Sequence, residues 1–232
     1  MMSAPIIQVA GILDLQEAMM LVECGVTVLG FPLKLDVHEE DMDEKAVAEV
    51  IRMLPRTVST VVITYLKSAD EIIRICTRTG AGGVQLHGDV EPAEAAELKR
   101  LAPGLRIIKS LVVRQDNRED LRRATAAYAP HVDAFLTDTF DASTGASGAT
   151  GKTHDWSISR ELAAFSRRPL ILAGGLDPGN VREAIHQVRP AGVDAHSGLE
   201  GPDGRKGREL VQAFVKQALA GFAGIDRLFR CR

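Results

Sequence analysis

The sequence predicts a closed barrel of eight parallel strands, each followed by a helix. Short β-branched runs alternate with amphipathic helical stretches, the alternation recurs eight times, and nothing interrupts it. The strand candidates are continuous apolar runs, which is typical of parallel strands covered by helices. Eight uninterrupted units favour closure into a (βα)8 barrel, the TIM barrel, over an open sheet.

The first half of the chain supplies four units. Strands are predicted at residues 6–10, 26–31, 59–65 and 83–87, and helices at 14–24, 43–54, 68–79 and 91–101. Asp14 is a residue type that caps helix N-termini. Ser68 has Glu71 three positions on, which is the pattern of a capping box.

The second half repeats the pattern, with strands at 106–113, 132–137, 169–173 and 193–196, and helices at 118–128, 157–166, 178–188 and 207–222. A long loop, Thr139 to Asp155, follows the sixth strand, and such loops are usually functional or disordered. No G-x-G-x-x-G follows the first strand, which argues against an open dinucleotide-binding sheet. We therefore expect one barrel domain over residues 1–232, with a C-terminal tail at 223–232.

Composition narrows the function classes. Hydrophobic residues make up 45% and charged residues 25%, as in ordinary soluble domains. The formal net charge of −3 argues against a nucleic-acid partner. No run approaches the ~18 apolar residues of a membrane span, and no secretory signal opens the chain. We expect a cytoplasmic protein without metal or cofactor, because the three cysteines and the scattered acidic and histidine residues lack ligand spacing.

Two glycine clusters follow the last two strands. Gly174-Gly175 comes after the seventh strand and Ser197-Gly198 after the eighth. Glycine lets backbone N–H groups approach an anion closely, and barrels often bind phosphate between these loops. The same glycines could simply make tight turns. We interpret Gly174, Gly175, Ser197 and Gly198 as a phosphate site, so the expected partner is a phosphorylated small molecule.

The sixth strand ends near a second candidate site. Asp138 lies where reactive groups of a barrel are found, although a carboxylate there can equally be a helix cap or solvated. Gly148-Ala149-Thr150-Gly151-Lys152, in the loop that follows, could fold over a ligand as a lid.

These segments resemble the phosphoribosylanthranilate isomerase family of tryptophan biosynthesis. The matching stretches, in family order over roughly residues 6 to 215, are Gln85-Leu86-His87-Gly88, Ile107-Ile108-Lys109, Asp138, Gly148-Ala149-Thr150-Gly151-Lys152-Thr153-His154-Asp155-Trp156, Ala173-Gly174-Gly175-Leu176 with Asn180-Val181, and Val193-Asp194 with Ser197-Gly198-Leu199-Glu200. The pattern Gly-x-Thr-Gly-Lys-x-x-Asp-Trp followed by Ala-Gly-Gly-Leu is specific to this family.

The resemblance implies an Amadori rearrangement of a phosphoribosyl-amine, an aldose-to-ketose isomerisation. The residue matching Asp138 is the general acid, which protonates the furanose ring oxygen. A general base then removes the C2 proton. The resemblance also implies that His87, Gly148 and Gly151 belong to the substrate-binding site together with the glycine loops.

The sequence departs from the family at the reacting centre. The family reads Lys-Ile-Cys-Gly at its first strand, with the cysteine as the base, whereas this chain has Gln8-Val9-Ala10-Gly11. The resemblance therefore places Ala10, which cannot accept a proton, at the position of the base. His196, where a small polar residue is usual, is a candidate replacement, as are His87 and His38.

The loop after the second strand departs as well. The family presents an arginine there that reads the anthranilate carboxylate, but residues 31–40 contain none and are acidic. Only Lys34 could replace the missing arginine as the cation that binds the carboxylate, and lysine is a poorer bidentate partner for a carboxylate.

Several hypotheses remain open at this stage. The chain is a phosphoribosylanthranilate isomerase-like protein, a related isomerase acting on a different phosphorylated substrate, or a non-catalytic paralogue that binds a phosphate ligand. Ala10 could also be an engineered substitution. A lyase using Lys109 as its nucleophile is a further alternative. We expect a monomer or a homodimer, since residues 225–232 could dock on a partner subunit or fray.

Overall fold

The computed structural model describes residues 5–35, 40–139 and 153–230. Its strands are β1 (Ile6–Ala10), β2 (Val28–Pro32), β3 (Ser59–Thr64), β4 (Gly83–Leu86), β5 (Arg106–Val113), β6 (Ala134–Thr139), β7 (Leu170–Leu172) and β8 (Gly192–Ala195). Its helices are α1 (Leu15–Glu23), α2 (Glu44–Met53), α3 (Ala69–Thr79), α4 (Pro92–Leu101), α5 (Arg118–Tyr128), α6 (Trp156–Phe165), α7 (Val181–Val188) and α8 (Arg208–Arg230), with a short 3-10 helix at Ser197–Leu199.

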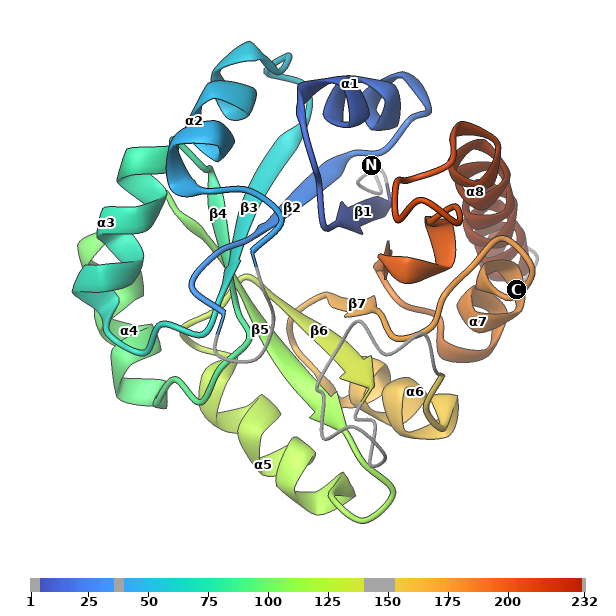
Figure 1. Ribbon diagram of the computed structural model, residues 1–232. Helices are drawn as coiled ribbons and strands as arrows, with labels where there is room; N and C mark the ends of the chain where they lie inside the picture. The colour runs from blue at the N-terminus through green and yellow to red at the C-terminus, as the bar shows by residue number, and fades with distance from the viewer. Residues whose placement is uncertain (1–4, 36–39, 140–152, 231–232) are drawn as a thin grey trace.

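The strands form a closed parallel barrel in chain order, β1 to β8, and β8 pairs with β1 through Gln8 opposite Asp194. The helices form a ring around it (Figure 1). This confirms the predicted (βα)8 fold. Asp14 caps α1 as expected, because its Oδ1 accepts from the amide of Glu17 at 2.8 Å. Ser68 precedes α3 but makes no side-chain cap hydrogen bond.

Two hydrophobic layers hold the barrel. A small cluster fills its interior, made of Val28, Val61, Ile108, Ala134, Leu136, Ile171 and Ala173. A larger cluster packs between the strands and the helices, with fully buried residues such as Phe135 and Phe214. Because side chains alternate along a strand, Ser110 and Asp138 follow Ile108 and Leu136 on the inner face.

Several predicted boundaries differ from the structure, most by one to three residues, and two differences matter for the site and the C-terminal segment. The sixth strand was expected to end at residue 137, but β6 runs to Thr139, because Val112 and Val113 of β5 pair with Asp138 and Thr139. The last helix continues to Arg230 rather than ending at residue 222, so much of the expected tail is helical. Within the described residues, no helix is long and apolar enough to cross a membrane.

Candidate active site at the C-terminal end of the barrel

Asp138 lies on the inner face of β6 and is 8% exposed. Burial raises the pKa of its carboxyl above the ordinary value of 3.8, and the nearby His87 and the amide of Thr139 only partly oppose this. The Thr139 N–H donates to Asp138 Oδ1 at 2.8 Å. A carboxyl group in such a place tends to keep its proton, which suits a proton donor.

His87 follows β4 and lies on the same side as Asp138. Its Nδ1 is 3.1 Å from Ser110 Oγ, and its ring meets that of Tyr65 edge-on at 5.1 Å between centroids. The side chain is therefore fixed between β3 and β5, beside the Asp138 carboxyl.

A second buried carboxyl, Asp194 on β8, was not singled out from the sequence as a site residue. Burial and the charge of Asp138 raise its pKa well above 3.8, whereas Gln8 and Lys206 act in the opposite direction. Its Oδ1 is buried and has no hydrogen-bond partner among the described residues. The sequence signal was available, because Asp194 is a charged residue within a strand that pairs on both sides.

Ala10 and His196 come together at the ends of β1 and β8. Gly11, next to Ala10, has φ of 74°, and a Cβ placed on it would stand 2.1 Å from His196 Nε2. The His196 ring therefore lies directly over the Gly11 backbone. Its Nε2 is 3.3 Å from Glu200 Oε1.

Lys206 and Glu17 tie the first loop to the last. The Lys206 ammonium donates to the Gly11 carbonyl at 3.0 Å and to Glu200 Oε1 at 2.8 Å. The Lys206 amide donates to Glu17 Oε1 at 2.8 Å, and Glu17 Oε2 accepts from the Leu13 amide at 2.9 Å. Because the Lys206 side chain is only 1% exposed, these bonds are well shielded from water.

The loops after β7 and β8 lie side by side. Gly174 and Gly175 have φ of 92° and 62°. A Cβ on Gly198 would stand 2.2 Å from the Leu176 carbonyl oxygen, and a Cβ on Gly174 would stand 2.0 Å from Thr139 Oγ1. These positions therefore require glycine, both for turn geometry and for close approach.

The amides of these loops are available to a ligand. Among the hydrogen bonds of the described residues, none takes the N–H of Gly174, Gly175, Ser197 or Gly198. The loop after β7 is itself fixed, because Asn180 Nδ2 donates to the Gly175 carbonyl at 2.8 Å. Several preoriented N–H groups at one place are what an anion such as phosphate needs.

His154, just before α6, is bound to β6 and to α6. Its Nδ1 is 2.9 Å from Thr139 Oγ1 and its Nε2 is 2.6 Å from Ser159 Oγ, which in turn donates to Thr137 Oγ1. Burial lowers the pKa of this imidazole to about 4, so it is neutral near pH 7. A cavity of about 650 Å³ beside it is lined by residues that follow β5 and β6.

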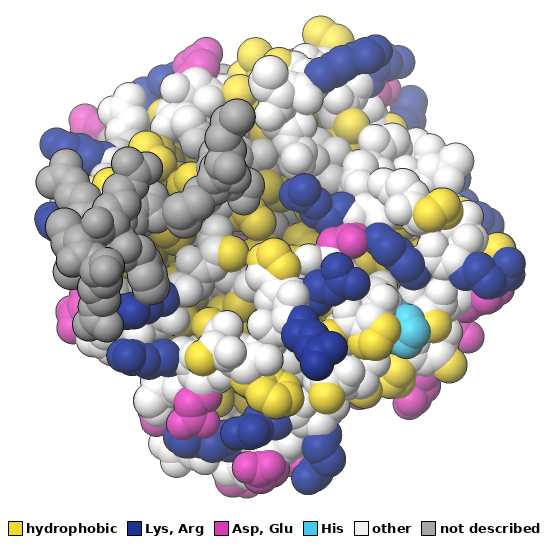
Figure 2. Space-filling view, turned by 180° about the vertical axis from the view of Figure 1, so that it is seen from behind, with side chains coloured by type: hydrophobic (Ala, Val, Ile, Leu, Met, Phe, Trp, Pro, Cys, Tyr) yellow, Lys and Arg dark blue, Asp and Glu magenta, His cyan; other side chains and the backbone are white. Residues whose placement is uncertain are grey.

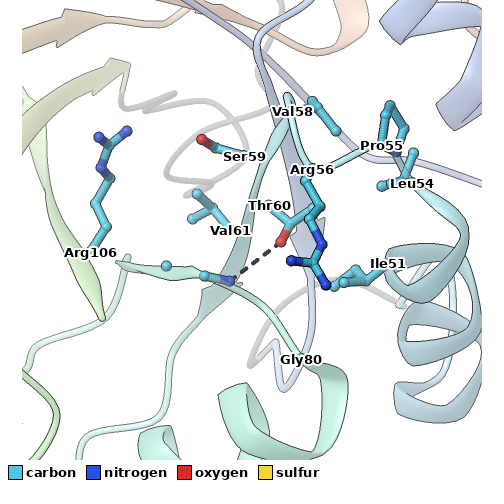
Figure 3. Close-up of a pocket in the computed structure, with 12 residues that line it drawn as sticks. Ile51, Leu54, Pro55, Arg56, Val58, Ser59, Thr60, Val61, Gly80 and Arg106 are labelled. Atoms are coloured by element: carbon cyan, nitrogen blue, oxygen red, sulfur yellow. Dashed lines mark hydrogen bonds between the residues drawn. The ribbon is translucent and has the colours of Figure 1, made fainter. Parts of the chain in front are cut away.

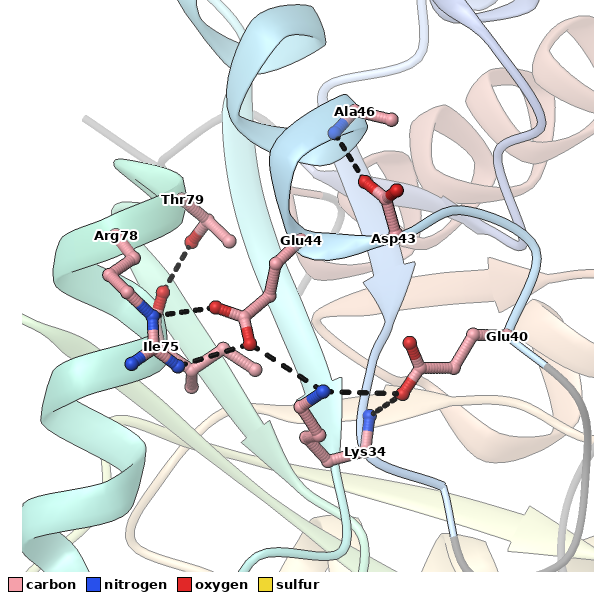
Figure 4. A network of polar contacts seen from close by, with 8 residues as sticks. All are labelled: Lys34, Glu40, Asp43, Glu44, Ala46, Ile75, Arg78 and Thr79. Carbon is pink, nitrogen blue, oxygen red and sulfur yellow. Dashed lines mark hydrogen bonds and ion pairs between the residues drawn. The ribbon is translucent and has the colours of Figure 1, made fainter.

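Lys34, after β2, is engaged by acidic neighbours (Figure 4). Its ammonium is 4.0 Å from Glu40 Oε1 and 3.5 Å from Glu44 Oε1, and its amide donates to Glu40 at 2.6 Å. Glu44 also binds Arg78 through two hydrogen bonds of 2.6 and 3.0 Å. The charge of the Lys34 ammonium, which could have bound a substrate carboxylate, is thus already balanced by Glu40 and Glu44.

Lys109 lies outside the barrel. It follows the inward Ile108, and its ammonium donates to the carbonyls of Leu86, Gly88 and Ser110 at 3.2, 3.0 and 2.9 Å. The hypothesis of a lyase with Lys109 as nucleophile is therefore wrong, because alternation turns this side chain toward the helices.

A separate hollow of about 350 Å³ lies at the N-terminal ends of β3, β4 and β5 (Figure 3). Arg56 and Arg106 contribute to its lining, and Thr60 Oγ1 accepts there from the Gly82 amide at 3.4 Å. None of the predicted site residues that the structure describes lines it. On the face opposite to that of Figure 1, Lys and Arg side chains are interspersed with acidic and hydrophobic ones (Figure 2).

Some predicted positions lie outside the described residues, namely Gly148, Gly151 and His38. In the part of the chain that is described, no three His, Cys, Asp or Glu side chains are grouped so that they could hold a metal ion.

Comparison with known proteins identifies the family. Residues 7–217 match the family model for N-(5'-phosphoribosyl)anthranilate (PRA) isomerase. The chain belongs to this family. The matched range extends from β1 into α8 and includes Ala10, Asp138 and His196. PRA isomerases are intramolecular aldose–ketose isomerases of tryptophan biosynthesis.

Individual PRA isomerases resemble the chain over nearly its whole length. PRA isomerase 2 of Methanosarcina mazei is 37% identical over 96% of this chain and 97% of its own. The enzyme of Haloferax volcanii is 35% identical over 95% and 96%. Among solved structures, PRA isomerase of Thermotoga maritima has a TM-score of 0.79 at 29% identity, covering 94% of this chain and all of its own.

Proposed function

We propose that this protein catalyses the PRA isomerase reaction at the C-terminal end of its barrel, using its own set of proton-transfer residues. The observation that supports this best is the position of Asp138, a buried carboxyl with a raised pKa, next to two loops that offer unused backbone amides. We further propose that residues 1–232 act as one barrel domain.

Asp138 acts as the general acid. A carboxyl that keeps its proton can protonate the furanose ring oxygen as the C–O bond breaks, which opens the sugar to a Schiff base. Removal of the C2 proton then gives an enolamine, which tautomerises to the ketose. General acid and general base catalysis typically contribute about 10²–10⁴-fold each.

Ala10 takes the position of the family's cysteine base and cannot accept a proton. His196 is the replacement base that we propose, because its ring lies over Gly11, the residue next to Ala10. An imidazole titrates close to neutral pH, so it can accept the C2 proton there. Glu200, 3.3 Å from His196 Nε2, would stabilise the imidazolium that forms.

The substrate phosphate binds at the loops after β7 and β8. Gly174, Gly175, Ser197 and Gly198 would donate backbone N–H groups to its oxygens, which is favourable for a dianion. His87 would contact the substrate beside Asp138, and Gly148 and Gly151 would cover it. A solved PRA isomerase that is 27% identical to this chain was crystallised with reduced 1-(o-carboxyphenylamino)-1-deoxyribulose 5-phosphate, which is itself a phosphorylated ketose derivative.

The protein is proposed to be a monomer or a homodimer. The Thermotoga maritima PRA isomerase, 28% identical to this chain in one solved structure, is dimeric, and monomers generated from it have also been solved. This supports either state for a barrel of this family.

A second candidate function is isomerisation of a different phosphorylated sugar-amine. The engagement of Lys34 by Glu40 and Glu44 favours it, because a substrate that carries an aromatic carboxylate gains little from a cation already balanced by two carboxylates. Loss of the family's cysteine at Ala10 points in the same direction.

The test is turnover of phosphoribosylanthranilate by the unmodified protein and by Asp138→Asn, His196→Asn and Ala10→Cys. We expect activity in the unmodified protein that is lost in Asp138→Asn and His196→Asn. Full activity in His196→Asn would remove His196 from the mechanism. Activity in Ala10→Cys alone would mean that the site is intact but lacks a base.

Binding of inorganic phosphate, measured by calorimetry, separates the remaining possibilities. Phosphate binding without turnover in any variant would favour the second candidate or a non-catalytic ligand binder. Absence of both turnover and phosphate binding would contradict the proposed site altogether.

A further inference from the structure

The turn after β4, residues 86–90, is held from the outer side of the barrel by two side chains. The ammonium of Lys109 donates to the carbonyls of Leu86 and Gly88 at 3.2 and 3.0 Å. The hydroxyl of Tyr128 on α5 donates to the carbonyl of Val90. Every second carbonyl of the turn is therefore bound by Lys109 or Tyr128.

Lys109 and Tyr128 also contact each other. The Lys109 ammonium lies 5.6 Å from the centre of the Tyr128 ring, close enough for a cation–π contact. Lys109 is 7% exposed, and it also donates to the Ser110 carbonyl at 2.9 Å. Three carbonyl acceptors use the full donor capacity of an ammonium group, so the side chain has one well-defined position.

The same turn carries His87 on its inner side. His87 Nδ1 contacts Ser110 Oγ, so neighbouring residues of β5 hold the turn from opposite faces: Ser110 from inside through His87, and Lys109 from outside. A Cβ on Gly88 would stand 2.9 Å from the Tyr65 carbonyl oxygen, so the turn also packs tightly against the chain that follows β3. The position of the turn therefore depends on contacts from both faces of the barrel.

We propose that Lys109 and Tyr128 are positioning residues for proton transfer: they fix the 86–90 turn so that His87 stays beside the carboxyl of Asp138. This rests on the proposed function, in which Asp138 is the general acid. Lys109 itself contacts neither the substrate nor the reacting atoms.

The energetic link between His87 and Asp138 makes the role measurable. His87 lowers the pKa of Asp138, against the larger effect of burial. A displaced His87 would let that pKa rise. Because the acid works only while protonated, the alkaline limb of kcat/KM would then move to higher pH.

The experiment compares Lys109→Met, Tyr128→Phe and His87→Asn with Lys45→Met, an exposed lysine on α2 that serves as the matched control. We expect the alkaline limb to move upward in the first three variants and to stay in place in the control. We also expect kcat to fall by about ten- to a hundredfold in Lys109→Met, as for a small displacement of a reacting group. The double variant Lys109→Met/His87→Asn should shift the limb no further than His87→Asn alone.

A second readout does not depend on turnover. The ring signals of His87 in NMR spectra, assigned from their absence in His87→Asn, should shift in Lys109→Met and in Tyr128→Phe but not in Lys45→Met. Tyr128→Phe loses a single hydroxyl, so it tests the inference even if Lys109→Met folds poorly.

The outcomes separate the two proposals. If the unmodified protein shows no turnover, the proposed function fails and the His87 signals alone decide the role of Lys109. His87 signals that stay unchanged in both variants, or a limb that does not move in folded protein, would overturn the positioning role.

Discussion

The imidazole of His196 lies against the backbone of Gly11, so closely that a methyl group on Gly11 would stand 2.1 Å from Nε2. Residues from the first and the last loops of the barrel therefore depend on each other for their positions. This contact places an imidazole ring beside Ala10, the position at which we propose that the family's base is missing.

Gly11→Ala should displace His196 and lower kcat by about a hundredfold, because small displacements of a reacting group are costly. The positive φ at Gly11 adds about 1 kcal/mol of destabilisation, because an L-residue is strained in the left-handed region. Gly104→Ala is the matched control, since nothing lies within 4 Å of a Cβ at that position. Steady-state kinetics and thermal unfolding check both effects, and a Gly11→Ala variant with undiminished kcat would contradict the role of His196.

Asp138→Asn should abolish most of the activity and yet stabilise the fold at pH 7. The folded pKa of Asp138 is raised above 3.8, so between these two pKa values the folded protein binds more protons than the unfolded chain. The contribution of Asp138 to stability is therefore fully present below about pH 3.8 and is lost as pH rises through its folded pKa. Urea unfolding should show that Asp138→Asn raises the free energy of unfolding at pH 7 but not at pH 4. An equal increase at both pH values would contradict the burial of an ionisable carboxyl as the cause.

Gly198→Ala should weaken binding of inorganic phosphate by about tenfold, since removing one good hydrogen bond to a charged group costs on the order of 1.5 kcal/mol. The added Cβ would meet the Leu176 carbonyl oxygen at 2.2 Å and push the two glycine loops apart. Calorimetric titration with phosphate provides the measurement, again with Gly104→Ala as the control. Unchanged affinity would place the phosphate elsewhere.

His154 should make the protein sensitive to mild acid. Its folded pKa of about 4 lies below the ordinary 6.5, so between these values the unfolded chain binds more protons than the folded protein. Stability conferred by the neutral ring is complete above pH 6.5 and declines as pH falls toward 4. In His154→Phe this part of the acid destabilisation should disappear, as measured by urea midpoints from pH 7 to pH 4. A midpoint profile identical to that of the unmodified protein would show that His154 already titrates normally.

The alternation of apolar runs and amphipathic stretches was sufficient to predict the barrel and the order of its elements. It could not fix the end of β6, because Asp138 and Thr139 are polar residues that pair with Val112 and Val113. Pairing with a long neighbouring strand overrode the weak strand preference of Asp138. The end of α8 was not fixed by the sequence pattern either, since the helix continues beyond residue 222.

The sequence was sufficient to predict that glycines follow β7 and β8, and the structure brings these two loops together; that they bind phosphate stays a prediction. The role of a side chain was not predictable where it depends on which groups surround that side chain in the folded protein. Lys34 and Lys109 are both lysines near strand ends, yet one is balanced by Glu40 and Glu44 and the other is bound by carbonyls outside the barrel. Which face of β5 is inward, and which acidic residues come near Lys34, depend on the folded structure.

The bond between the Lys206 amide and the Glu17 carboxylate joins positions 189 residues apart. During synthesis from the N-terminus, the residues up to β8 and Lys206 must therefore leave the ribosome before β1 gains its second neighbouring strand and this hydrogen bond forms. Nascent chains shorter than that should expose an unpaired β1 edge, the kind of surface on which self-association begins. A nascent chain with seven complete βα units would accordingly be prone to self-association. The eighth unit would cover the β1 edge and also supply a loop that we propose binds the ligand.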